Sequence, residues 1–208
     1  MALDTYDNLK LEIIDWSHRK DVDLKIDTFI ALAETEMYNN SVENLKVRGQ
    51  ESLNSQTLST ITRNLTLPSD YLSMRSIRIQ VGDIWRPVYF EAPESLNIRD
   101  DNGIPCFFTV TSQIEFDIVS ESDYPVEIQY LAKPTALSSS NQTNIVLTDN
   151  PSIYLFGSLA ALYRWADQPE DYTTYYNQFI SAIVGANANY DAGRYGPAPT
   201  MRVDGSTP

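Results

Sequence analysis

The end of the chain constrains the fold most, because a long apolar run is followed directly by an amphipathic one. Asn150 and Pro151 are typical of a helix entrance, with Asn at the N-cap and Pro at the first helical position. Nearly every face of the following run is apolar, which predicts a helix surrounded by other elements. After a break at Pro169, apolar and aromatic residues again recur at helical spacing. We therefore expect a helical hairpin, with helices over 150–167 and 170–191.

Two further helices are predicted near the start of the chain, over 5–17 and 24–39. Leu9, Ile13 and Trp16 share one face of the first helix and are expected to point inward. The second helix has the same kind of inward stripe, formed by Ile26, Phe29, Ile30, Ala33 and Met37. These helices are the natural partners of the later hairpin, so both ends of the chain should build one bundle.

The middle of the chain, 47–133, shows a period of two and predicts strands. Alternating residues on both sides of Gly82 and Asp83 predict a β-hairpin. The residues 134–150 read as a long polar connection without structure of its own. The predicted fold class is therefore α+β, mainly α: a helical bundle from the N- and C-terminal helices with an inserted small antiparallel β-sheet and an extended C-terminal arm.

The predicted organisation is a single domain over 1–192, followed by the arm over 193–208. The arm is rich in Pro and Gly and has little to bury. No stretch is long and apolar enough to cross a membrane.

The charge balance is acidic, with 28 Asp and Glu against 15 Lys and Arg and a net charge of −13. A nucleic-acid-binding protein normally carries a basic stripe, and this sequence shows none. His18 and Cys106 are the only residues of their kinds, so an internal disulfide is excluded and a metal cluster would need carboxylates alone. We expect no cofactor and no metal, and we interpret Cys106 as a small strand hydrophobe.

Two carboxylate pairs are the remaining candidates for catalysis, Glu34 with Glu36 and Glu115 with Asp117. Glycoside cleavage needs one buried acid beside an ionised partner. Residues two apart in a helix or a strand do not provide that arrangement, so we expect surface charge at all four positions and no enzymatic activity.

Aromatic residues are abundant, with thirteen Tyr and three Trp. Large amphipathic rings are favoured at protein interfaces. Tyr172, Tyr175 and Tyr176 together make an aromatic face too wide for one buried stripe. We therefore predict that these three tyrosines contact neighbouring subunits.

Several short motifs, in order, carry a resemblance to a known family. They are Thr5-Tyr6 with Trp16, then 29–34, 67–72, 104–109, 130–138 and 150–157. Together with the closing helical hairpin, this series resembles the head-to-tail adaptor, or connector, proteins of tailed bacteriophages.

The resemblance implies a structural virion protein of the neck, assembled in the host cytoplasm. Its copies would form a ring, usually twelvefold, that joins the portal protein to the tail nozzle or fibre proteins and extends the channel through which DNA passes without specific binding. The arm would reach the portal or a neighbouring subunit, and its candidate contacts are Arg194, Tyr195, Pro197, Met201, Arg202 and Val203. Two alternatives stay open: a peptidoglycan hydrolase of the tail, and a tail-side module that binds a fibre or receptor through the sheet.

Overall fold

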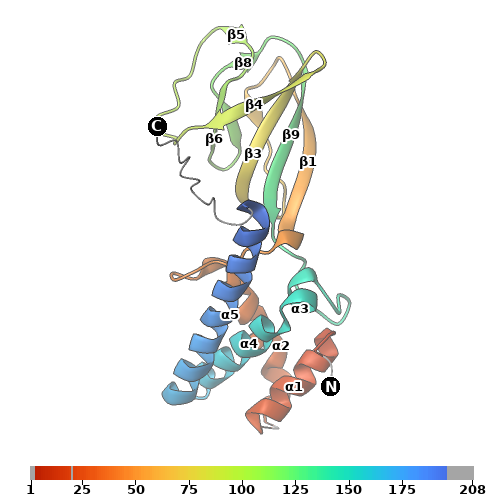
Figure 1. Cartoon of the computed structure of the whole chain (residues 1–208), viewed down its shortest axis with the longest axis vertical. Helices are drawn as coiled ribbons and strands as arrows, with labels where there is room; N and C mark the ends of the chain where they lie inside the picture. Colours follow the sequence, from red (N-terminus) through yellow and green to blue (C-terminus); the bar gives the residue numbers. More distant parts are fainter. Residues whose placement is uncertain (1–2, 20, 196–208) are drawn as a thin grey trace, which may run out of the picture. The chain divides into compact units, whose positions relative to one another are not determined.

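The computed structural model describes residues 3–19 and 21–195. The segments before Gln50 and after Lys133 form one compact unit, and Gln50–Lys133 form a second. The helices gather in the first unit and the strands in the second (Figure 1).

The helical unit is built around α4, which packs against the four other α-helices. The α-helices are α1 (Tyr6–Ser17), α2 (Ile26–Asn39), α3 (Ile145–Asp149), α4 (Pro151–Trp165) and α5 (Pro169–Tyr195). A short 3-10 turn, Asp23–Lys25, leads into α2, and another, Arg48–Gln50, precedes the first strand. One hydrophobic core joins residues from all five α-helices, including the fully buried Leu9, Ile30, Leu147, Leu159 and Ile183.

The helix starts follow from local side-chain chemistry. The Thr5 hydroxyl accepts a hydrogen bond from the Asn8 amide at 3.2 Å and caps α1, while Asn144 accepts one from the Leu147 amide at 3.0 Å and caps α3. Asn150 stands at the N-cap position of α4, but its side chain makes no capping bond. Pro151, whose fixed φ suits a first helical turn, begins α4 as the sequence predicts.

The structure corrects two details of the helical expectations. Trp16 is exposed rather than inward, and its ring meets Phe156 of α4 edge-on at 6.1 Å. The connection 134–150 is not structureless, because α3 occupies its end.

The sheet unit contains a seven-stranded sheet and a separate two-stranded one. The strands are β1 (Glu51–Leu58), β2 (Asn64–Leu65), β3 (Tyr71–Val81), β4 (Ile84–Phe90), β5 (Asn102–Gly103), β6 (Phe107–Val110), β7 (Ile114–Phe116), β8 (Val119–Ser120) and β9 (Tyr124–Ala132). The large sheet has the order β1-β9-β3-β4-β6-β7-β2, and β5 pairs with β8. All neighbours in the large sheet are antiparallel except β4 and β6.

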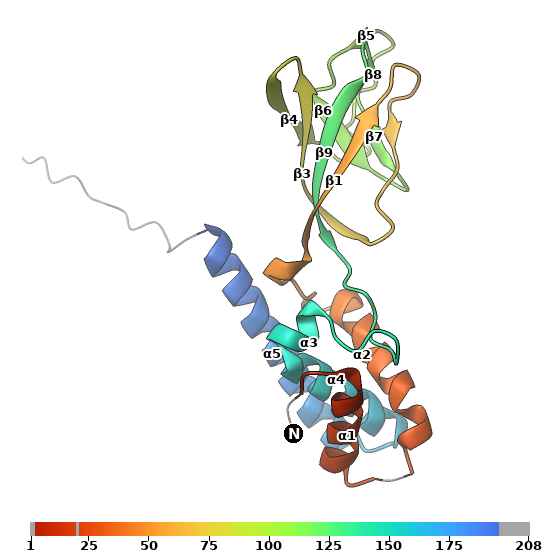
Figure 2. The ribbon, with the colours of Figure 1, turned by 90° about the vertical axis from the view of Figure 1, so that its right-hand side faces the viewer.

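The predicted β-hairpin is confirmed as β3 and β4, which turn at Gly82. Gly82 has a φ of 61°, a conformation that glycine adopts without steric cost. The large sheet curls until its last strand, β2, lies beside its first, β1 (Figure 2). The Gln56 side chain of β1 donates to the Thr66 carbonyl just after β2 at 2.8 Å and helps to close this almost complete barrel.

The predicted fold class is therefore wrong. The chain is not a mainly helical bundle with a small inserted sheet, because the strands form a nearly closed seven-stranded sheet with its own core. Inward residues such as Ile77, Ile79, Val126 and Ile128 alternate along β3 and β9 and fill that core. The short strands β2, β5 and β8 carry no periodic signal, which is why the sequence underestimates the sheet.

Candidate functional site

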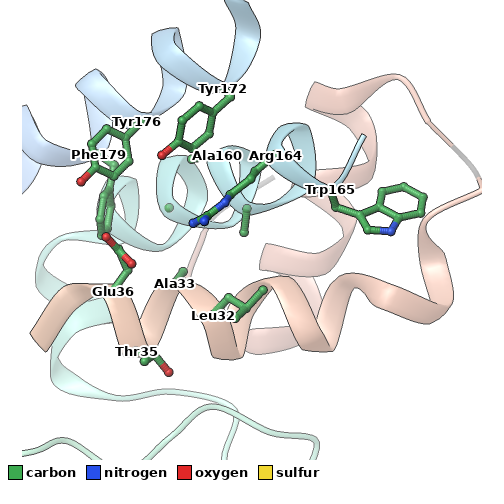
Figure 3. Close-up of a pocket in the computed structure, with 12 residues that line it drawn as sticks. Leu32, Ala33, Thr35, Glu36, Ala160, Arg164, Trp165, Tyr172, Tyr176 and Phe179 are labelled. Atoms are coloured by element: carbon green, nitrogen blue, oxygen red, sulfur yellow. The ribbon is translucent and has the colours of Figure 1, made fainter. Parts of the chain in front are cut away.

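An open groove on the helical unit is the principal candidate site. It has a volume of about 430 Å³ and lies between α2, α4 and α5 (Figure 3). Its lining residues are Leu32, Ala33, Thr35, Glu36, Gly157, Ala160, Ala161, Arg164, Trp165, Tyr172, Tyr176 and Phe179.

The floor of the groove is made of small residues. Ala33, Gly157, Ala160 and Ala161 lie where α2 and α5 approach α4. A Cβ atom added at Gly157 would stand 2.9 Å from a ring carbon of Phe179 and 3.0 Å from the Ala33 Cβ. Gly157 therefore permits the close approach of the three helices that shapes the floor.

Apolar and aromatic side chains form the walls. Leu32 is 51% exposed, and the rings of Tyr172 and Tyr176 stack with centroids 5.5 Å apart. The side-chain nitrogen of Asn40 donates one hydrogen bond to the Tyr176 hydroxyl at 3.0 Å and one to the Glu36 carboxylate at 3.1 Å. The walls are thus held in position before any partner binds.

Basic side chains lie over the groove and at its Trp165 end. Arg164 extends from α4 over the groove, Trp165 lies at one end, and Glu36 lies toward the other (Figure 3). Trp165 is 44% exposed, and its ring carries the Arg19 guanidinium at 5.4 Å and the Lys25 ammonium at 5.0 Å. The ion pairs of the described residues leave the Arg164 guanidinium without a carboxylate partner.

The three predicted contact tyrosines do not share one environment. Tyr172 and Tyr176 line the groove. Tyr175 lies outside its lining and stacks on Tyr163 at 5.2 Å with nearly parallel rings.

Of the predicted portal contacts, Arg194 and Tyr195 are the last two residues of α5. The other four, Pro197, Met201, Arg202 and Val203, lie outside the described residues.

Sequence reasoning missed the groove because α4 was expected to be surrounded. The small residues Gly157, Ala160 and Ala161, followed by the charged Arg164, were the available signal.

Glu34 is not a surface charge, which corrects the sequence-based interpretation. It is only 8% exposed, and one carboxylate oxygen accepts hydrogen bonds from the Leu137 amide at 2.8 Å and from the Tyr154 hydroxyl at 2.9 Å. Burial, and then the negative charge of Glu34, raise the pKa of Tyr154 far above its ordinary range. The carboxylate thereby joins α2 to α4 and to the connection before α3.

Asp117 is also buried rather than on an outer strand face, being 2% exposed. Its carboxylate accepts hydrogen bonds from the amides of Cys106 and Phe107 at 3.1 and 3.2 Å and pairs with Arg99 at 2.7 Å. This carboxylate fixes the entry of β6. Cys106 itself is exposed and precedes β6, so its interpretation as a strand hydrophobe is wrong.

A second groove, of about 760 Å³, lies in the sheet unit beside β3, β4 and β6. Its lining includes Tyr71, Met74, Tyr89 and Phe90. Tyr89 and Phe90 of β4 and the neighbouring Phe107 of β6 are exposed, and the Tyr89 and Phe107 rings lie 6.4 Å apart. The sheet unit therefore presents its own aromatic surface.

Residues 3–19 and 21–195 contain neither a metal site nor a helix that could span a membrane. No group of three or more His, Cys, Asp or Glu side chains there could hold a metal ion. Within the same residues, every helix is too short or too polar to cross a membrane.

The model of one family, described as SU10 adaptor protein, matches residues 4–202. The chain belongs to the SU10 adaptor protein family. No curated protein matches the chain. Membership in the SU10 adaptor protein family indicates a structural adaptor protein of bacteriophages, a virion component that interacts with other head or tail proteins.

Proposed function

We propose that copies of this SU10-family adaptor stand side by side in a twelvefold ring that joins the portal to the tail and extends the DNA channel. The groove between α2, α4 and α5 carries the proposal, because it leaves an apolar floor and aromatic walls open to solvent. Apolar surface of this kind marks interaction sites on folded proteins. Leu24, in the 3-10 turn before α2, is another exposed apolar side chain of the helical unit, at 97% exposure.

A ring needs one surface of each copy to meet a different surface of the next, because a closed ring is built from head-to-tail contacts. Tyr172 and Tyr176, the two predicted contacts that line the groove, belong to such an interface in this proposal. In the same proposal, Tyr175 lies at the edge of this interface between copies.

The net charge of −13 suits a wall beside moving DNA. Phosphates are repelled by carboxylates, so DNA would slide past such a wall rather than bind to it.

The arm, residues 193–208, is proposed to hold the portal. The test is a pull-down with purified portal that compares the full chain with a chain ending at Tyr195. This truncation keeps α5 whole and retains the hydrogen bond from Arg48 to the Gly193 carbonyl. Loss of portal binding by the truncated chain supports the arm, and equal binding by both chains rejects a portal contact made by residues 196–208.

The sheet unit supports a second contact, with a tail nozzle or fibre protein. The exposed rings of Tyr89, Phe90 and Phe107 carry this proposal, since aromatic residues are enriched at interface centres. A Tyr89→Ala and Phe90→Ala variant should still join the portal but recruit less tail protein. The matched control is Leu53→Ala, an exposed substitution on β1.

The buried carboxylates of Glu34 and Asp117 do not support the alternative function as a peptidoglycan hydrolase. Glu34 and Asp117 are each occupied by structural hydrogen bonds from within the fold. A zymogram of the intact chain tests this directly, and clearing of the cell-wall substrate would reverse the conclusion.

A further inference from the structure

The outer face of α1 is built to fit the groove. Asp7, Leu11 and Asp15 are spaced four residues apart, so they form one stripe along the helix. All three side chains are exposed, and Leu11 is 49% exposed. The ion pairs of the described residues engage neither Asp7 nor Asp15.

The groove offers the complementary arrangement. Its apolar floor includes Ala160 and Ala161, and the unpaired Arg164 stands one helical turn further along α4. Leu11 and Asp15 are likewise separated by one turn of α1. With Leu11 over the apolar floor, the Asp15 carboxylate would therefore lie at the Arg164 guanidinium.

The positive charge of Lys25 near the groove strengthens this match. Lys25 lies over the Trp165 ring and adds positive charge at that end of the groove, while Arg19, over the same ring, is paired with Asp21. Opposite charges at the rim of an interface fix its register and exclude wrong partners.

The groove of the same copy is not available to α1. Every residue of the groove lining comes from α2, α4 or α5, and α1 is tied to the unit by its buried face, through Tyr6, Leu9 and Ile13. The stripe and the groove are separate surfaces of one chain, as a head-to-tail contact requires.

We propose that the groove receives α1 of a second copy of this chain, with Leu11 over Ala160 and Ala161 and Asp15 paired with Arg164. This inference rests on the proposed ring and names the two surfaces that meet in it. An amphipathic helix laid into an apolar groove is a common mode of protein recognition.

Disulfide trapping on portal-bound rings tests the contact. In a Cys106→Ser background, Leu11→Cys and Ala161→Cys are combined in one chain, the chain is assembled on the portal, and the sample is oxidised. We expect a ladder of cross-linked products up to the full ring. A mixture of the two single variants should stop at dimers, and Leu11→Cys combined with Leu53→Cys should give no ladder.

Three outcomes would overturn the inference, and each has its own signature. Rings visible by electron microscopy without a ladder reject this contact and leave the ring intact. Cross-linking of Ala161→Cys to Met201→Cys instead would assign the groove to the C-terminal segment. The absence of rings on portals would reject the proposed function and this contact together.

Charge exchange provides an independent readout. Arg164 and Asp15 are exposed, so Arg164→Glu and Asp15→Arg should fold normally. Each should reduce the fraction of ring-bearing portals by roughly tenfold, because like charges then face each other. The double variant restores the pair and should recover the rings. No recovery, or no loss in either single variant, rejects the pairing.

Discussion

The carboxylate of Glu34 in α2 accepts a hydrogen bond from the Tyr154 hydroxyl of α4 at 2.9 Å inside the helical core. Asn144, the cap of α3, donates to the same hydroxyl at 2.7 Å. A buried charge of this kind is tolerated only where hydrogen bonds replace water. The Tyr154 hydroxyl therefore joins α2 to α4 and to the cap of α3 inside the helical core.

Removing the Glu34 carboxylate should destabilise the helical unit. Glu34→Ala leaves the Leu137 amide and the Tyr154 hydroxyl without this acceptor, and each buried unpaired donor costs about 1–3 kcal/mol. We expect a loss of about 3 kcal/mol in the free energy of unfolding, measured by urea denaturation. Glu34→Gln keeps an acceptor oxygen and should lose less. An equal loss in both variants would show that the hydrogen bonds are not the cause.

Buried tyrosines should make the protein sensitive to alkali. Burial is the main cause that raises the pKa values of Tyr38 and Tyr154 above the ordinary 10.0, and the Glu34 charge adds to it. The folded state binds these protons more tightly than the unfolded state does. The associated stability is therefore complete below pH 10.0 and is lost as the pH rises beyond it.

Tyrosinate absorbance should consequently rise in two stages, the second coinciding with the loss of helical circular dichroism. Tyr154→Phe should weaken this alkaline dependence. A single ionisation step near pH 10.0, with the circular dichroism unchanged, would be inconsistent with the buried hydroxyls.

Gly157 in α4 and Gly185 in α5 should respond to alanine in opposite directions. Gly157→Ala places a methyl group against Phe179 and Ala33, and overpacking of this kind costs about 1–3 kcal/mol. Gly185 in α5 has no atom within 4 Å of an added Cβ, so Gly185→Ala should stabilise by about 0.5–1 kcal/mol through helix propensity. Urea unfolding of both variants provides the measurement. Equal stabilisation at both positions would mean that Gly157 does not control the close packing.

Asn187 should hold the last third of α5 in place. Its side chain accepts a hydrogen bond from the Lys46 amide at 2.7 Å and donates to the Asn44 carbonyl at 2.9 Å and to Glu43 at 2.7 Å. Asn187→Ala should cost about 2 kcal/mol.

Hydrogen exchange should also speed up across the end of α5 in this variant, because its anchor to 43–46 is lost. The exposed Asn189→Ala serves as the matched control and should change stability by less than about 0.5 kcal/mol. Unchanged exchange in Asn187→Ala would refute the anchoring role.

The helices were predictable because their signals are local. Thr5, Pro151 and Pro169 mark helix starts within a few residues, and the apolar spacing gives the inward faces. The extent of the sheet was not predictable in the same way. The parallel pairing of β4 with β6 and the two-residue strands depend on contacts between distant segments.

The candidate site shows the same division. Tyr172 and Tyr176 were identified from their aromatic spacing, and both line the groove. The burial of Glu34 was not visible, because its partners Leu137 and Tyr154 lie 103 and 120 residues away. A carboxylate between Ala33 and Thr35 reads as solvent-exposed until those partners are known.

The central claim is that copies of this chain complete one another in a ring. Electron microscopy of the full chain assembled on its purified portal tests it most directly. We predict a closed ring of copies, twelve in number, in which the groove between α2, α4 and α5 of each copy is covered by its neighbour. A single copy on the portal, or copies that leave Leu32 and Trp165 open to solvent, would contradict the account.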